Sequence, residues 1–162
     1  MYIDFEKMPS NTRVWVYLAN KTLNDTEKNQ IGDFLKPNMQ SWAAHGEALY
    51  GGYAFIENTF LIIAVDQQAH MPSGCSIDAS TRWIKEIHER FGVDFLTRAI
   101  VVKNQDSVQS LPVFQIKKHI EEGLIAADSL IYDQQVSTKA ELEESFLKPA
   151  SHVFSRYFLE KV

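Results

Sequence analysis

The sequence predicts an α+β fold built on a ferredoxin-like β-α-β-β-α-β core. The first observation is the order of segments in the first 104 residues, which reads strand, helix, strand, strand, helix, strand. The second is a hydrophobic content of 45% in 162 residues, which is ample for one buried core. No internal repeat or long linker divides the chain. We therefore expect a single domain over residues 1–162, with a core at 1–104 and a C-terminal α/β extension at 105–162.

Four runs rich in β-branched and aromatic residues predict the strands of this core. They lie at residues 13–19, 50–57, 59–66 and 97–103. The second and third are separated by about one residue at Asn58, which is typical of a compact hairpin.

The first helical segment has a clear start. Asn24, with Glu27 three residues later, forms a capping-box pattern, and an apolar face follows at Ile31, Phe34 and Leu35. Pro37 is expected to interrupt this helix. A second helical piece is predicted over residues 38–44, with His45 at its end and Gly46 as its stop.

The clearest helix is predicted over residues 77–91. Ser76 can cap it and Gly92 ends it, while an apolar stripe runs along Ile77, Ile84, Ile87 and Phe91.

One strand needs cover on both faces, because residues 60–65 are apolar at odd and even positions alike. The tail is the expected supplier. It predicts a helix over 113–122 stopped by Gly123, a strand over 130–133, a capping box at Thr138 and Glu141, and a last helix from about Pro149.

This topology predicts where chemistry would lie. If the first strand runs upward, the first helical segment, the hairpin and the loop before the second helix all end at the same lower edge. Seven side chains from these segments are expected there as candidate site residues: Trp42, His45, Asp66, Cys75, Ser76, Asp78 and Arg82.

Cys75 is the candidate nucleophile of this edge. It lies at the predicted start of a helix, where unpaired N–H groups and the helix dipole favour a thiolate, and His45 could act as its base. The alternatives are a small buried residue at a helix cap, or an exposed thiol that oxidises reversibly without a base.

The same turn has a second interpretation that needs no reactive thiol. Backbone N–H groups and the Ser76 hydroxyl could hold an anion, with Arg82 nearby on the helix. Asp78 argues against this, because a carboxylate in the first turn already complements the dipole. Simple capping by Ser76 and Asp78 is the alternative.

Several classes of function are not indicated. The net charge is −5, with 16 basic and 21 acidic residues interspersed, so we expect no nucleic-acid partner. No apolar run is long enough for a membrane span, and we expect no cofactor. The histidines lack the spacing of metal ligands, so no metal site is expected either. A single cysteine and an acidic N-terminal segment predict a cytoplasmic protein.

Three stretches resemble a family of small bacterial proteins of unassigned function, whose members are often labelled "ABC transporter ATPase". They are Trp42-x-x-His45-Gly46, residues 64–67 (AVDQ), and Gly74-Cys75-Ser76-Ile77-Asp78-x-Ser80, and the similarity extends over essentially the whole chain. The label implies ATP hydrolysis. The sequence has no G-x-x-x-x-G-K-[ST] motif, so the resemblance brings no catalytic residue and no nucleotide with it.

The sequence favours a binding or interaction protein, with a small molecule or a protein partner at the edge formed by Trp42, His45 and Cys75. The alternative is a small cysteine-dependent enzyme that uses Cys75 as nucleophile and His45 as base. An exposed strand at the edge of a sheet could also mediate a homodimer.

Overall fold

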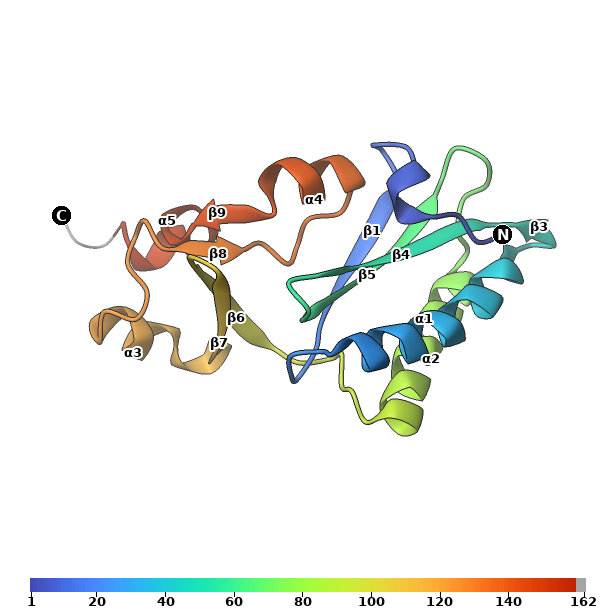
Figure 1. The fold of residues 1–162 in the computed structure, drawn as a ribbon. Coiled ribbons are helices and arrows are strands. Elements are labelled where there is room, and N and C mark those ends of the chain that lie inside the picture. The colour runs from blue at the N-terminus through green and yellow to red at the C-terminus, as the bar shows by residue number, and fades with distance from the viewer. Residues whose placement is uncertain (160–162) are drawn as a thin grey trace. The chain divides into compact units, whose positions relative to one another are not determined.

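The computed structural model describes residues 1–159 and shows a mixed helix and sheet protein (Figure 1). The chain forms two compact units. The first comprises Met1–Thr97 and Val136–Leu142, and the second comprises Arg98–Gln135 and the residues from Glu143 on. The α+β class is thus confirmed. The expected core boundary at residue 104 and the packing of an extension onto that core stay predictions.

The first unit contains a three-stranded antiparallel sheet in the order β1-β5-β4. These strands are β1 (Arg13–Leu18), β4 (Tyr50–Ile56) and β5 (Phe60–Asp66), which confirms three of the four predicted strands. The turn between β4 and β5 holds Glu57 and Asn58 at positive φ. From Phe60 to Val65 every residue of the central strand β5 is fully buried, as its continuous apolar run indicated.

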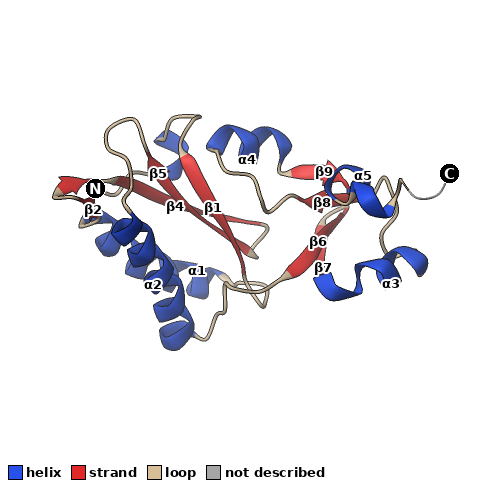
Figure 2. Ribbon diagram, turned by 180° about the vertical axis from the view of Figure 1, so that it is seen from behind, coloured by secondary structure: helices blue, strands red, loops and turns tan. Residues whose placement is uncertain are grey.

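Two long helices cover one face of this sheet, α1 (Asp25–Gln40) and α2 (Gly74–Phe91) (Figures 1 and 2). The capping box of Asn24 and Glu27 is present at the start of α1. Gly92 ends α2 in the left-handed conformation, as predicted. The helices pack against Leu61, Ile63 and Val65 of β5 in the main core of the unit.

The prediction that Pro37 interrupts the first helix is wrong, because α1 continues to Gln40. Proline removes one N–H, the one that would bond the carbonyl of Asp33. Both residues are exposed, so water can satisfy that carbonyl. One residue further on, the Asn38 side-chain amide donates to the carbonyl of Phe34 at 2.8 Å, which supports the last turn.

The second helical piece predicted over residues 38–44 is also wrong in its second half. The chain leaves α1 at Ser41 and forms a small hairpin, β2 (Ala43–Ala44) and β3 (Glu47–Ala48). His45 and Gly46 are the two residues of its turn, both at positive φ. Such turns match the twist of a hairpin. A glycine at positive φ also ends helices, and this shared signal explains the error.

The opposite face of the sheet is covered at Gly52 by the N-terminal segment. A Cβ there would lie 2.7 Å from the Met8 sulfur, so only glycine fits. Lys139 holds the same segment in place, because its buried ammonium donates to the carbonyls of Phe5, Glu6 and Met8 at 2.9 to 3.1 Å.

The second unit has its own antiparallel sheet in the order β7-β6-β8-β9. Its strands are β6 (Ala99–Asn104), β7 (Ser107–Pro112), β8 (Leu130–Tyr132) and β9 (Leu147–Pro149). The fourth predicted strand, residues 97–103, is present as β6 but pairs with β7 and β8 rather than with β1. Within the described residues the two sheets are separate, so the four-stranded ferredoxin-like sheet is not formed. The strand β7, which was not predicted, pairs with β6 along its whole length.

Short helices complete the second unit. The predicted helix over 113–122 appears as a 3-10 turn η2 (Val113–Gln115) and α3 (Ile116–Glu121), followed by Gly123. The chain also forms α4 (Lys139–Ser145), which begins in the first unit, α5 (Ala150–Val153) and the 3-10 turn η3 (Ser155–Tyr157). The N–H of Glu141 bonds the Thr138 hydroxyl, whereas the Glu141 carboxylate accepts from Ser137. Along the described chain, no helix is both long and apolar enough to cross a bilayer.

Candidate functional site

The first unit contains a cavity of about 560 Å³ at the end of α1 and the start of α2. One wall comes from the end of α1 and the β2–β3 hairpin: Asn38, Ser41, Trp42, Ala43 and His45. The other wall comes from the first half of α2 and its cap: Ser73, Cys75, Ser76, Ala79, Arg82 and Trp83. Its size is in the range of small-molecule sites.

Five of the seven predicted site residues therefore line one cavity, namely Trp42, His45, Cys75, Ser76 and Arg82. The other two lie outside its lining. Asp66 ends β5 and accepts a hydrogen bond from the N–H of Gln68 at 2.9 Å, while Asp78 is exposed on α2. Two of the expected chain segments meet at this cavity, and the end of the hairpin at Asp66 does not join them.

Trp42 joins the two walls. Its indole N–H donates to the carbonyl of Ser76 at 2.9 Å, and its ring meets Trp83 edge to face with centroids 5.0 Å apart. Both rings are at least nine-tenths buried. Buried aromatic pairs of this geometry add stability beyond their area, so the contact between the two walls is apolar and well packed.

The cap of α2 differs from the prediction. Ser73, not Ser76, is the N-cap, and the two serines form a reciprocal capping box. The Ser76 hydroxyl accepts from the N–H of Ser73 at 2.7 Å and donates to the Ser73 carbonyl at 2.8 Å. The helix begins three residues earlier than predicted because this serine pair satisfies its first N–H groups.

The earlier start of α2 changes the positions of Cys75 and Asp78 within the helix. Cys75 lies inside the first turn rather than before the helix, and it is exposed, so the prediction of a small buried residue is wrong. Asp78 falls beyond the first turn, which contains no acidic residue. The objection that Asp78 already complements the helix dipole is therefore removed.

His45 and Cys75 line the same cavity from opposite walls. Within residues 1–159 no hydrogen bond joins the imidazole to the thiol, so a preformed nucleophile–base pair is absent from the described chain. His45 is exposed at the tip of the hairpin turn, and its position there comes from backbone geometry rather than from a helix C-terminus.

Arg82 is the fixed positive charge of the cavity. It is exposed on α2 and forms no ion pair with any carboxylate of the described chain, including Asp78 one turn earlier. No carboxylate belongs to the lining formed by the described residues.

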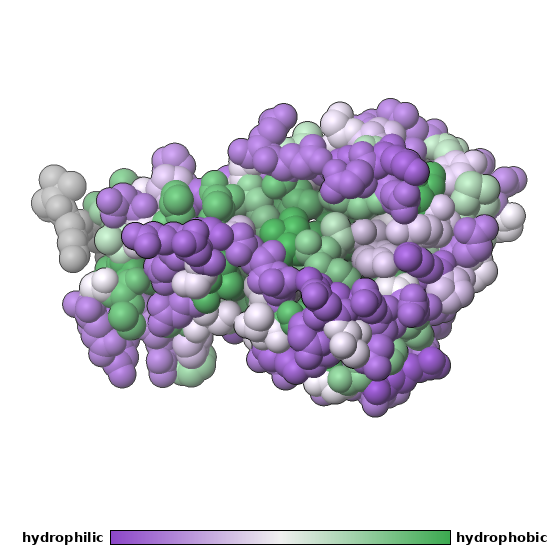
Figure 3. Space-filling view, in the orientation of Figure 1, coloured by the Kyte–Doolittle hydropathy of each residue, from purple (hydrophilic) through white to green (hydrophobic). Residues whose placement is uncertain are grey.

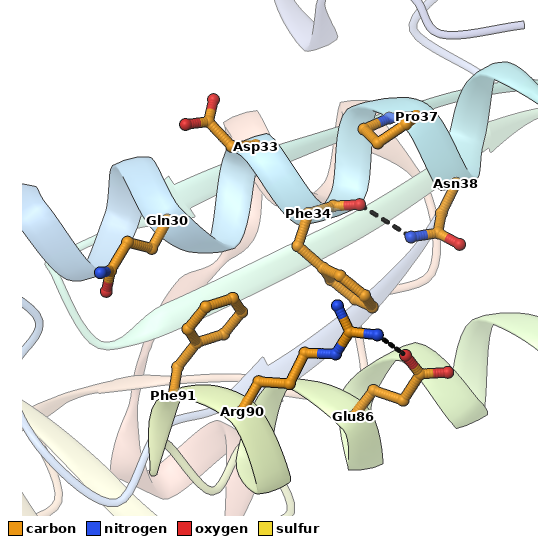
Figure 4. A pocket seen from close by; sticks show the side chains of 8 residues that line it. All are labelled: Gln30, Asp33, Phe34, Pro37, Asn38, Glu86, Arg90 and Phe91. Atoms are coloured by element: carbon orange, nitrogen blue, oxygen red, sulfur yellow. Dashed lines mark hydrogen bonds and ion pairs between the residues drawn. The ribbon is translucent and has the colours of Figure 1, made fainter.

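A second cavity, of about 470 Å³, lies further along the same two helices and shares Asn38 with the first (Figure 4). Its arginine, Arg90, already has partners within the protein. The Arg90 guanidinium pairs with the Glu86 carboxylate at 3.3 Å and lies over the Phe34 ring at 5.0 Å from the centroid. Asp33 adds a further carboxylate to this lining.

Sequence reasoning missed six residues of the first lining. The predicted helix over residues 38–44 gives Asn38, Ser41 and Ala43 helical directions. In the structure the helix ends at Gln40, so Ser41 and Ala43 take other directions and reach the lining. Ser73 was missed because a serine at the third helical position is a less familiar capping partner than glutamate. Trp83 and Ala79 follow Ser76 at helical spacing, which is a signal that could have found them.

No group of three or more histidine, cysteine or acidic side chains within residues 1–159 is arranged to hold a metal ion. No protein-family model, curated protein or solved structure matches the chain. The resemblance to the small bacterial family therefore stays a prediction.

Proposed function

We propose that this protein is a binding protein whose ligand, a small molecule, occupies the cavity between the β2–β3 hairpin and α2. The observation that carries the proposal is the cavity itself, of about 560 Å³, whose lining combines the polar and charged side chains of His45, Cys75 and Arg82 with the packed tryptophan pair. Apolar surface with a few placed polar groups is the usual composition of ligand sites.

The construction of the walls supports this function. The Trp42–Ser76 hydrogen bond joins one wall to the other before any ligand binds, so binding has to order only the exposed side chains along the walls. By contrast, His45, Cys75 and Arg82 remain exposed and have no structural partner in the described chain. These are the groups available to a ligand.

The test is a thermal-shift screen of a small-metabolite library on the full chain. Hits are repeated on Cys75→Trp, which places an indole in the cavity from an exposed position. His88→Trp is the matched control, because it is exposed on the same helix but outside the lining. Hits that shift the melting of wild type and control but not of Cys75→Trp support the proposal. A library in which every hit acts equally on all three proteins contradicts it.

The second candidate function is a small cysteine-dependent enzyme, favoured by one observation. Cys75 is exposed in the cavity that His45 also lines. Catalytic hydrogen bonds are often long before substrate binds, so the pair could close on binding. We expect His45→Gln to slow iodoacetamide labelling of Cys75 near neutral pH if His45 acts as base. An unchanged pH profile of labelling would remove this candidate.

A further inference from the structure

We infer that the ligand of this cavity is a small organic anion, bearing a carboxylate or a phosphate next to an apolar body. The inference rests on the proposed binding function and specifies the ligand's chemical class. It is drawn from the charge of the lining rather than from the helix end alone.

The lining of the cavity, as residues 1–159 form it, carries a positive charge and no negative one. The whole chain has a net charge of −5, yet the only permanently charged side chain in this lining is Arg82. His45 and the second amide hydrogen of Asn38 add further donors, because the first already bonds Phe34 and the Ser41 hydroxyl already donates to the backbone carbonyls of its own turn. A ligand that neutralises Arg82 therefore meets no opposing carboxylate in the lining.

The two arginines that line the cavities on α2, Arg82 and Arg90, differ in their partners. Arg90 in the neighbouring cavity is already paired with Glu86 and stacked on Phe34. Arg82 has no such partner in the described chain, so its guanidinium can still offer two parallel N–H groups to a carboxylate or phosphate. The two cavities thus differ in what they can accept, although they share Asn38.

Another part of the lining indicates the chemistry of the body of the ligand. The apolar part of the lining comes from Trp42, Trp83 and Ala79, and the Trp42 indole N–H is already used by Ser76. These groups offer apolar surface rather than hydrogen bonds. They match an aromatic or aliphatic body attached to the anionic group.

The experiment uses four probes of similar shape: benzoate, phenyl phosphate, neutral benzamide and cationic benzamidine. Binding is followed on the full chain by two-dimensional amide and indole NMR, reading the Trp42 indole N–H and the amides of residues 73–83. We expect benzoate or phenyl phosphate to shift these signals with an affinity roughly tenfold above that of benzamide. Benzamidine should bind least. Which anion binds more tightly distinguishes a carboxylate ligand from a phosphate ligand.

The matched variants are Arg82→Gln and Lys85→Gln, which remove the same charge from the same helix, inside and outside the lining. Arg82→Gln should weaken binding of the anionic probes by about tenfold and leave benzamide unchanged. Lys85→Gln should leave all four affinities within about twofold.

Loss of anion specificity and loss of all binding at the cavity give different results in this experiment. Benzamide binding at the cavity as tightly as both anions would overturn the anion specificity and leave the binding function standing. Equal loss of anion binding in both variants would also overturn it, because the effect would then be one of net charge. Absence of any response at Trp42 and residues 73–83 to all four probes would contradict both proposals.

Discussion

The two compact units differ in how completely they bury their apolar side chains. The first buries six consecutive residues of β5 completely and covers the sheet with helices of 16 and 18 residues. The second relies on strands as short as three residues and on helices of six and four residues, α3 and α5. It leaves large side chains exposed, and green patches of hydrophobic residues are visible on it in Figure 3. These exposed side chains include Val113, Phe114, Leu124, Leu130 and Leu147.

The difference shows where rigidity is available for a site. The candidate cavity lies in the unit whose walls are long helices and buried aromatic rings. Packing of an amphipathic helix face supplies most helical stability in proteins, and helices of four or six residues offer little such face. We therefore expect the first unit to be the more stable of the two, and the following predictions test that comparison.

The largest effect is expected from Ile63→Ala in the centre of β5. Ile63 is fully buried, so truncation should cost about 4 kcal/mol of the free energy of unfolding through lost burial and the cavity left behind. The counterpart in the second unit, Ile131→Ala, should cost about 3 kcal/mol because its surroundings can collapse more easily. Urea unfolding measures both.

Hydrogen exchange read by mass spectrometry sharpens this first comparison. Loss of protection in Ile63→Ala should be concentrated in β1, β4 and β5 and be smaller in β6 to β9. Equal loss across both sheets would mean that the two units unfold as one.

The next largest effect is expected from Lys139→Met, which keeps the aliphatic stem and removes the ammonium. Three backbone carbonyls of the N-terminal segment lose their donor, which should cost about 3 kcal/mol. Lys7→Met is the control, because Lys7 is exposed and solvent screens its ion pair with Asp4. Similar urea midpoints for the two variants would show that the buried ammonium contributes no more than a surface charge.

A smaller effect is expected from Gly51→Ala. The new Cβ would lie 2.7 Å from Cε3 of Trp42, whose ring is held by Ser76 and Trp83, so the clash should cost about 2 kcal/mol. Gly74→Ala has open space and a helical position, and should be neutral or stabilising by about 0.5 kcal/mol. Thermal unfolding compares the pair, and a Gly51→Ala protein that melts with wild type would show that the Trp42 wall can shift.

The smallest effect on stability is expected at alkaline pH, from the ionisation of Tyr2. Burial, the neighbouring Tyr53 and the Asp4 carboxylate raise the pKa of Tyr2 from 10.0 to about 12. The neutral phenol is favoured in the fold, so its stabilising contribution is complete below pH 10 and is lost as the pH rises toward 12.

Ultraviolet titration of wild type against Tyr2→Phe isolates this group. Asp4→Asn removes the negative charge and leaves a weaker, neutral amide oxygen to accept from the Tyr2 hydroxyl, so the pKa of Tyr2 should move part of the way back toward its usual value. A Tyr2 pKa that is unchanged in Asp4→Asn would show that burial and Tyr53 raise it without a contribution from Asp4.

Elements marked by local signals were predictable from the sequence. The Asn24–Glu27 box, the Gly92 stop and the continuous apolar run of β5 each act within a few residues, and each is present. Elements that depend on distant partners were not. The strand β7 has an ordinary polar sequence and forms because β6 pairs with it, and β9 is three residues long.

The candidate site shows the same division. Trp42, Cys75, Ser76 and Arg82 line one cavity because they follow the end of α1 or lie in the first half of α2, as the predicted direction of the two helices indicated. His45 reached the cavity for a different reason than expected, through a hairpin turn. Asp66 was misplaced because the turn after β5 engages its carboxylate locally with Gln68.

The return of residues 136–142 to the first unit has a consequence for biosynthesis. The backbone of Val14 bonds Ser137, and Lys139 anchors the N-terminal segment, so the earliest part of the chain needs contacts made almost at its end. On the ribosome, the first unit stays incomplete until Leu142 has emerged, after all of residues 98–135 have been synthesised. The time taken to translate residues 98–135 is therefore a time during which β1 lacks its backbone partner at Ser137.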